Sequence, residues 1–104
     1  MFSQATKVVL IVERLIQDDV VDILERGGAK GYTIVPGSGK GEHSRRRGRG
    51  AHIVDDFTIV RIEFIIADAA KARALAEEVA TTWFEQYPGI VYVSDVEVIR
   101  AERF

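Results

Sequence analysis

The sequence predicts an α+β protein with a ferredoxin-like βαββαβ sandwich, in which two helices cover one face of a four-stranded antiparallel sheet. Apolar residues switch between strand and helix periods in that order along the chain. The two helical segments also have similar lengths. With 104 residues, 47% of them hydrophobic, the chain forms one domain over 1–104 and leaves no room for a second.

Three elements are predicted in the first third of the chain. Residues 7–13 (KVVLIVE) form a β-branched apolar run, typical of a strand buried on both faces. Over residues 15–26 the apolar positions, Leu15 among them, recur at helical spacing, and Gly27-Gly28 provides the stop. Residues 31–35 (GYTIV) predict a second strand, which Pro36 is expected to end.

A long strand and the second helix follow. In residues 57–67 (FTIVRIEFIIA) apolar side chains alternate with Arg61 and Glu63, so one face of this strand is expected to meet water or an interface. Over residues 69–87 the apolar positions follow the helical rule, the composition is rich in alanine, and Pro88-Gly89 closes the helix. Trp83, Phe84 and Tyr87 are interpreted as packing residues.

The last strand begins at residue 90. Residues 90–93 are apolar, and residues 95–99 continue extended with Val96 and Val98 out of phase, so a bend is expected near Ser94 or Asp95. The sheet face away from the helices is expected to carry apolar side chains, namely Tyr92, Ile65 and Ile59. Association with another protein surface through this face would shield them from water.

The segment 36–56 is too long for an ordinary hairpin connection, which takes about 2 to 5 residues. Five basic residues and one acidic residue within 40–50 give it a formal charge of about +4, while the rest of the chain is acidic. Glycines at Gly37 to Gly41 allow backbone N–H groups to face a phosphate, and further hydrogen bonds can come from Lys40, Ser44, Arg45, Arg46 and Arg47. The alternative reading is a solvated charge run.

Composition also limits the function. The chain has no cysteine, which excludes disulfides, thiol catalysis and thiolate zinc sites. His43 and His52 lack a defined third ligand, so no metal site is expected, and a triad of Ser44, His43 and Asp55 is interpreted as coincidence. No apolar run is long enough to cross a bilayer and no signal peptide is recognisable, so a soluble cytoplasmic protein is expected.

Over nearly its whole length the sequence resembles the PII-like signalling proteins. It is most similar to the bicarbonate-linked branch, which comprises SbtB-type partners of bicarbonate transporters and carboxysome-associated PII proteins. The resemblance is carried by residues 28–33 (GAKGYT), 39–41 (GKG) and 87–93 (YPGIVYV). It implies a homotrimer with nucleotide sites in the clefts between subunits, and a T-loop at 36–56 that becomes ordered around the ligand.

The resemblance also implies which residues bind. Thr33 and Gly39, Lys40 and Gly41 match the cleft and the base of the T-loop, while Ser44, Arg45 and Arg46 match the phosphate-binding stretch. Gly89 and Ile90 match the opposite loop, and Arg100 and Arg103 resemble C-terminal basic residues directed at phosphates. The implied ligands are AMP, ADP, ATP or cyclic AMP, with bicarbonate beside the nucleotide, and no tightly bound cofactor. The implied partner is a bicarbonate transporter or a carboxysome-related protein.

Two departures from the family pattern exclude some of the family's activities from the expected function. Residues 36–56 contain no tyrosine, and the loop at 88–90 reads Pro-Gly-Ile, so uridylylation and 2-oxoglutarate sensing are not expected. Without cysteine, redox-gated hydrolysis is not expected either. A regulatory nucleotide sensor in inorganic-carbon regulation ranks first, a nucleic-acid or polyanion-binding module second, and an enzyme third, because no nucleophile and base pair is held by regular structure.

Overall fold

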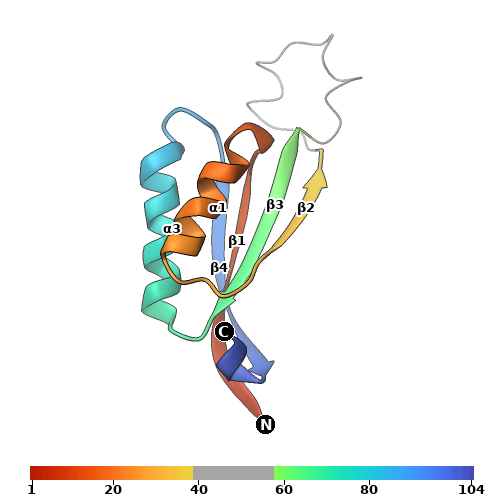
Figure 1. The fold of residues 1–104 in the computed structure, drawn as a ribbon, viewed down its shortest axis with the longest axis vertical. Coiled ribbons are helices and arrows are strands. Elements are labelled where there is room, and N and C mark those ends of the chain that lie inside the picture. Colours follow the sequence, from red (N-terminus) through yellow and green to blue (C-terminus); the bar gives the residue numbers. More distant parts are fainter. Residues whose placement is uncertain (39–57) are drawn as a thin grey trace.

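Four strands form one antiparallel sheet in the order β2-β3-β1-β4, and two helices pack on one of its faces (Figure 1). The computed structural model describes residues 1–38 and 58–104. The predicted ferredoxin-like sandwich is confirmed. Its elements are β1 (Phe2–Glu13), the 3₁₀ helix η1 (Arg14–Ile16), α1 (Gln17–Arg26), β2 (Thr33–Gly37), β3 (Ile59–Ile66), α3 (Ala69–Trp83), β4 (Ile90–Ile99) and the 3₁₀ helix η3 (Ala101–Arg103).

The hydrophobic core lies between the sheet and the two helices. Alternate residues of β1 and β3 face the helices, where they pack against apolar residues at helical spacing. Burial of these side chains is the main favourable term in folding. The core consists of Val8, Leu10, Val12, Ile16, Val20, Ile23, Leu24, Val60, Ile62, Phe64, Ile66, Ala72, Leu75, Ala76 and Val79.

The expected end of the second strand is wrong. β2 continues through Pro36, which pairs with Val60, and Gly37, which pairs with Ile59. Proline is tolerated here because β2 is an edge strand, so its missing N–H interrupts no ladder on the outer side. β2 also begins at Thr33, two residues later than expected.

The first helix also differs from its prediction. Leu15 was assigned to its apolar face, but it lies in η1 and is 71% exposed. The 3₁₀ turn rotates the chain before α1 begins at Gln17, so the helical period does not extend back to Leu15. The second helix ends at Trp83, where turns formed by Phe84 and Tyr87 lead the chain back onto the core. The ring centroids of Trp83 and Tyr87 lie 5.9 Å apart, which confirms their packing role.

β1 and β4 continue beyond the helices as a two-stranded ribbon, visible below the rest of the sheet in Figure 1. Their pairing is continuous from Phe2–Ile99 to Ile11–Ile90. Val96 and Val98 therefore lie on the opposite face from Val91 and Val93 simply through strand alternation. Beyond the ends of the helices, the apolar residues of β4 lie on the other face of the strand. This explains why Val96 and Val98 are out of phase with Val91 and Val93, and no bend near Ser94 or Asp95 is needed.

The start of α3 is set by Asp68. Its side chain accepts hydrogen bonds from the backbone N–H groups of Ala70, at 2.9 Å, and Lys71, at 3.2 Å. Asp68→Ala is expected to lower the free energy of unfolding by about 1 kcal/mol, because the first helical N–H groups lose their acceptor. Urea unfolding measures this. Asp68→Asn, which can still cap, should lose much less, and an equal loss in both variants would contradict the capping role.

Candidate functional site

A pocket of about 250 Å³ opens where β2 begins, beside the C-terminal half of β3. Thr33 and Glu63 are direct partners across these strands, so a hydroxyl and a carboxylate lie side by side on the sheet face away from the helices. Aromatic and aliphatic groups supply the rest of the wall. The pocket is lined by Gly31, Tyr32, Thr33, Glu63, Phe64, Ile65 and Phe104.

Two side-chain contacts flank this pocket. The hydroxyl of Tyr32 donates a hydrogen bond of 2.9 Å to Oε2 of Glu25 on α1, and both residues are exposed. This hydrogen bond raises the pKa of Tyr32, so the phenol is protonated at neutral pH. Arg61 and Glu63 form an ion pair of 3.3 Å along β3. The pocket thus offers both a carboxylate oxygen and apolar surface to a flat, polar-edged ligand.

The C-terminal residues reach the same pocket through a sharp turn. Arg100 has φ 68° and ψ 57°, the left-handed region, and no other non-glycine residue in the two described ranges has positive φ. The chain then forms η3 and brings Phe104 into the pocket wall. Arg100 pairs with Glu102 at 3.9 Å, and Arg103, which directly precedes Phe104, is exposed. The structure therefore brings the predicted residues Thr33 and Arg103 to one end of the sheet.

Gly89 and Ile90 stand elsewhere. Ile90 begins β4 and Gly89 directly precedes it, on the opposite edge of the sheet from β2. A Cβ on Gly89 would lie 2.5 Å from the Phe84 ring, so this glycine also has a packing reason. Three strand spacings separate the β2 and β4 edges, about 14 Å, and the length of β4 separates Ile90 from Arg100 by about 30 Å.

The predicted residues between the strands cannot be placed. Gly39, Lys40, Gly41, Ser44, Arg45, Arg46 and Arg47 lie outside the described residues, as do most of the predicted T-loop, His43 and His52. Within the described ranges there is no group of three or more side chains suited to a metal ion. No helix among residues 1–38 and 58–104 is long and apolar enough to span a membrane.

Comparison with known proteins decides the family. The family model described as nitrogen regulatory protein P-II matches residues 5–103. The chain belongs to the P-II family. The predicted resemblance to PII-like proteins is thereby confirmed.

Solved structures of P-II relatives match almost the whole chain. CPII from Thiomonas intermedia K12, bound to ADP and bicarbonate, is 32% identical with a TM-score of 0.81, and the match covers 100% of this chain and 97% of that one. CPII bound to ADP, AMP and acetate is 30% identical with a TM-score of 0.79 over the same shares. A candidate PII-like signalling protein from Thermus thermophilus is 31% identical with a TM-score of 0.79, covering 99% and 97%. These relatives support the predicted bicarbonate-linked branch.

The sheet face away from the helices carries exposed apolar residues in this P-II protein. Ile90 is 57% exposed, Val35 is 52% exposed and Tyr92 is 45% exposed. Ile59 and Ile65 are half-buried on the same face, as predicted, and Ile11 lies at its centre between Arg61 and Ile90. We call this surface the open face. Exposed apolar side chains on one sheet face can form a surface for protein association.

Sequence reasoning assigned only Thr33 of the seven pocket residues to a site. The six residues it missed are Gly31, Tyr32, Glu63, Phe64, Ile65 and Phe104. The alternation of residues 57–67 put Glu63 on a face expected to meet water or an interface, which was the available signal. Phe104 follows β4 and carried no signal, because only the turn at Arg100 brings it back to β3.

Proposed function

We propose that this P-II family member is a regulatory protein that binds adenine nucleotides between copies of itself in a homotrimer. The observation that carries the proposal is the division of the predicted site between two edges of the sheet. Thr33 lies on β2, and Arg103 directly precedes the pocket residue Phe104, whereas Gly89 and Ile90 lie at the β4 edge. A second copy that brings its β4 edge near the first copy's β2 edge would unite them, and the apolar open face supplies a surface for such association.

The pocket at the start of β2 suits the base of the nucleotide. Its volume of about 250 Å³ accommodates a purine ring, and its aromatic and aliphatic walls provide stacking surface. Glu63 can accept a hydrogen bond from an exocyclic amine, and the Thr33 hydroxyl can donate or accept one. Adenine carries such an amine at C6, and the ADP and AMP bound by the CPII relatives support an adenine base here.

The phosphates would then meet the basic residues. Arg103 stands beside the pocket, and the formal charge of about +4 over residues 40–50 supplies further cations to the same ligand. Lys40, Ser44, Arg45, Arg46 and Arg47 are the residues we propose for this role, with Gly39, Gly41 and Gly89 offering backbone N–H groups and Ile90 packing beside them. The ligand would order part of the T-loop, and hydrogen exchange of residues 37–55 should slow when ADP saturates the protein.

ADP with bicarbonate is the ligand pair we propose first. The supporting observation is that CPII, 32% identical over the whole chain, has been solved with ADP and bicarbonate. A change in the T-loop surface on binding would signal to a bicarbonate transporter or a carboxysome-related protein, and a cytoplasmic location fits this role. We propose that the protein is not an enzyme, because a sensor needs only reversible occupancy.

Titration calorimetry tests this function. ADP, AMP, ATP and cyclic AMP are each titrated with and without bicarbonate, with GDP as the matched control. We expect saturable ADP binding, at least about tenfold weaker GDP binding and no release of inorganic phosphate. Binding of DNA or heparin with a steep salt dependence, together with no response to any nucleotide, would favour the polyanion-binding alternative.

A further inference from the structure

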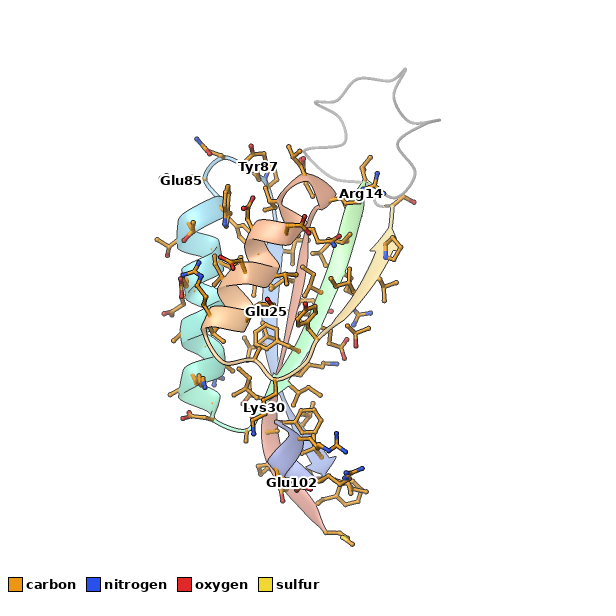
Figure 2. The ribbon with its side chains drawn as sticks, in the orientation of Figure 1. Arg14, Glu25, Lys30, Glu85, Tyr87 and Glu102 are labelled. Atoms are coloured by element: carbon orange, nitrogen blue, oxygen red, sulfur yellow. The ribbon has the colours of Figure 1, made fainter. Side chains whose placement is uncertain are left out.

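The segment between α1 and β2 holds the C-terminal turn. Nζ of Lys30 donates a hydrogen bond of 3.0 Å to the backbone carbonyl oxygen of Glu102 in η3. Figure 2 shows Lys30 directly above the turn that carries Glu102, although the two residues are 72 positions apart in the sequence. A lysine ammonium group is well suited to this place, since the last carbonyls of a helical turn lack backbone partners and carry partial negative charge.

The turn itself needs external support. Arg100 adopts a left-handed conformation, which is unfavourable for a residue with a Cβ. Inside the turn, the N–H groups of Arg103 and Phe104 donate to the carbonyls of Arg100 and Ala101, each at 3.0 Å. Among residues 1–38 and 58–104, two hydrogen bonds connect the turn to the rest of the fold: the one from Lys30, and one of 3.3 Å from the N–H of Ala67 to the carbonyl of Phe104. The Lys30 bond is the shorter of these and carries a formal charge.

The same segment also lines the pocket. Gly31 and Tyr32, which directly follow Lys30, form one wall, and Phe104, two residues after Glu102, forms another. The Lys30 hydrogen bond therefore fixes the distance between two walls of the pocket without Lys30 lining it.

We infer that Lys30 is a positioning residue for the pocket, acting through the C-terminal turn on Phe104 and Arg103. The inference rests on the proposed function for its ligand, but its structural half concerns the free protein. With Lys30 in place the turn is ordered and its wall preformed, so binding does not have to order these residues. Without it the turn samples other positions, and the fraction of binding-competent molecules falls.

The test compares Lys30→Met, Lys30→Arg and Arg26→Met. Methionine keeps much of the aliphatic stem and removes the donor, whereas arginine retains a charged donor. Arg26→Met is the matched control, because it removes one positive charge from an exposed ion pair with Asp22 on α1. Calorimetry should show roughly fivefold weaker ADP binding for Lys30→Met and wild-type binding for Arg26→Met, with arginine restoring most of the loss. Thermal unfolding should be little changed in all three.

A double-mutant cycle separates positioning from a general structural role. If Lys30 acts through Phe104, Lys30→Met should weaken ADP binding much less when Phe104 is already alanine. Additive losses would overturn the assigned route, and unchanged ADP binding in Lys30→Met would overturn the inference itself.

Amide exchange of Arg103 and Phe104 in the free protein distinguishes this failure from failure of the proposed function. Faster exchange in Lys30→Met than in wild type and Arg26→Met is expected. If the wild-type protein bound no ADP, the proposed function would be wrong, and so would the role of Lys30 in ligand binding. The amide exchange rates of Arg103 and Phe104 would still show whether Lys30 holds the turn. Equal exchange in all variants would refute that as well.

Discussion

Replacing Arg45, Arg46 and Arg47 together with alanine is expected to weaken ADP binding by at least about 100-fold. The physical reason is the loss of several charge-assisted hydrogen bonds to the phosphates, which reinforce one another when they share a ligand. The charge of residues 40–50 falls from about +4 to about +1 by the same formal count, so attraction of the anion weakens too. Titration calorimetry at physiological salt measures the change.

A matched variant controls for overall charge. Arg26, Lys71 and Arg73 are exposed on α1 and α3, and their joint replacement by alanine also removes three positive charges. This control should bind ADP with near wild-type affinity, apart from a small loss of long-range attraction that salt suppresses. Equal affinities in both triple variants would remove Arg45, Arg46 and Arg47 from the site.

If the protein forms the proposed trimer through the open face, Ile11→Lys is expected to give monomers and to abolish nucleotide binding as well. Ile11 is half-buried at the centre of the open face, where Arg61 and Ile90 are its neighbours on the adjoining strands. In a monomer the lysine stem can reach solvent, so the fold is retained. In a trimer joined through this face, an unpaired ammonium beside Arg61 would be buried, at a cost of several kcal/mol. Light scattering at micromolar concentration measures the mass.

Leu15→Lys provides the comparison. Leu15 is equally apolar, but it lies in η1 and is already 71% exposed, outside the open face. The trimer and its ADP affinity should both survive this change. A trimeric Ile11→Lys protein with normal circular dichroism would show that association does not use the open face.

The order of elements was predictable from the sequence because it depends on local periodicity. Residues 7–13 form a continuous apolar run that is buried on both faces, whereas 59–66 and 69–83 bury one side against the core. The boundaries of the strands and helices were harder to predict, because they depend on the neighbouring segments in the fold. Pro36 remains in a strand because β2 has no outer neighbour, and Leu15 leaves the helical face because η1 precedes α1. Neither fact is visible in a single stretch of sequence.

The candidate site was predictable only in part, for a similar reason. Thr33 was assigned through a family resemblance, and the structure places it in the pocket. Glu63 joins it through the β2–β3 register, and Phe104 through a left-handed residue at Arg100 that the sequence did not predict. The contact between Lys30 and Glu102 spans 72 residues, so no local pattern could indicate it.

Native mass spectrometry in the presence of ADP tests the central claim most directly, because it reports assembly and occupancy in the same molecules. The account predicts a trimer that takes up ADP one molecule at a time to about three, and no ADP on any monomer. ADP bound to monomers, or a trimer that remains empty at saturating ADP, would contradict a nucleotide site built between copies of the chain.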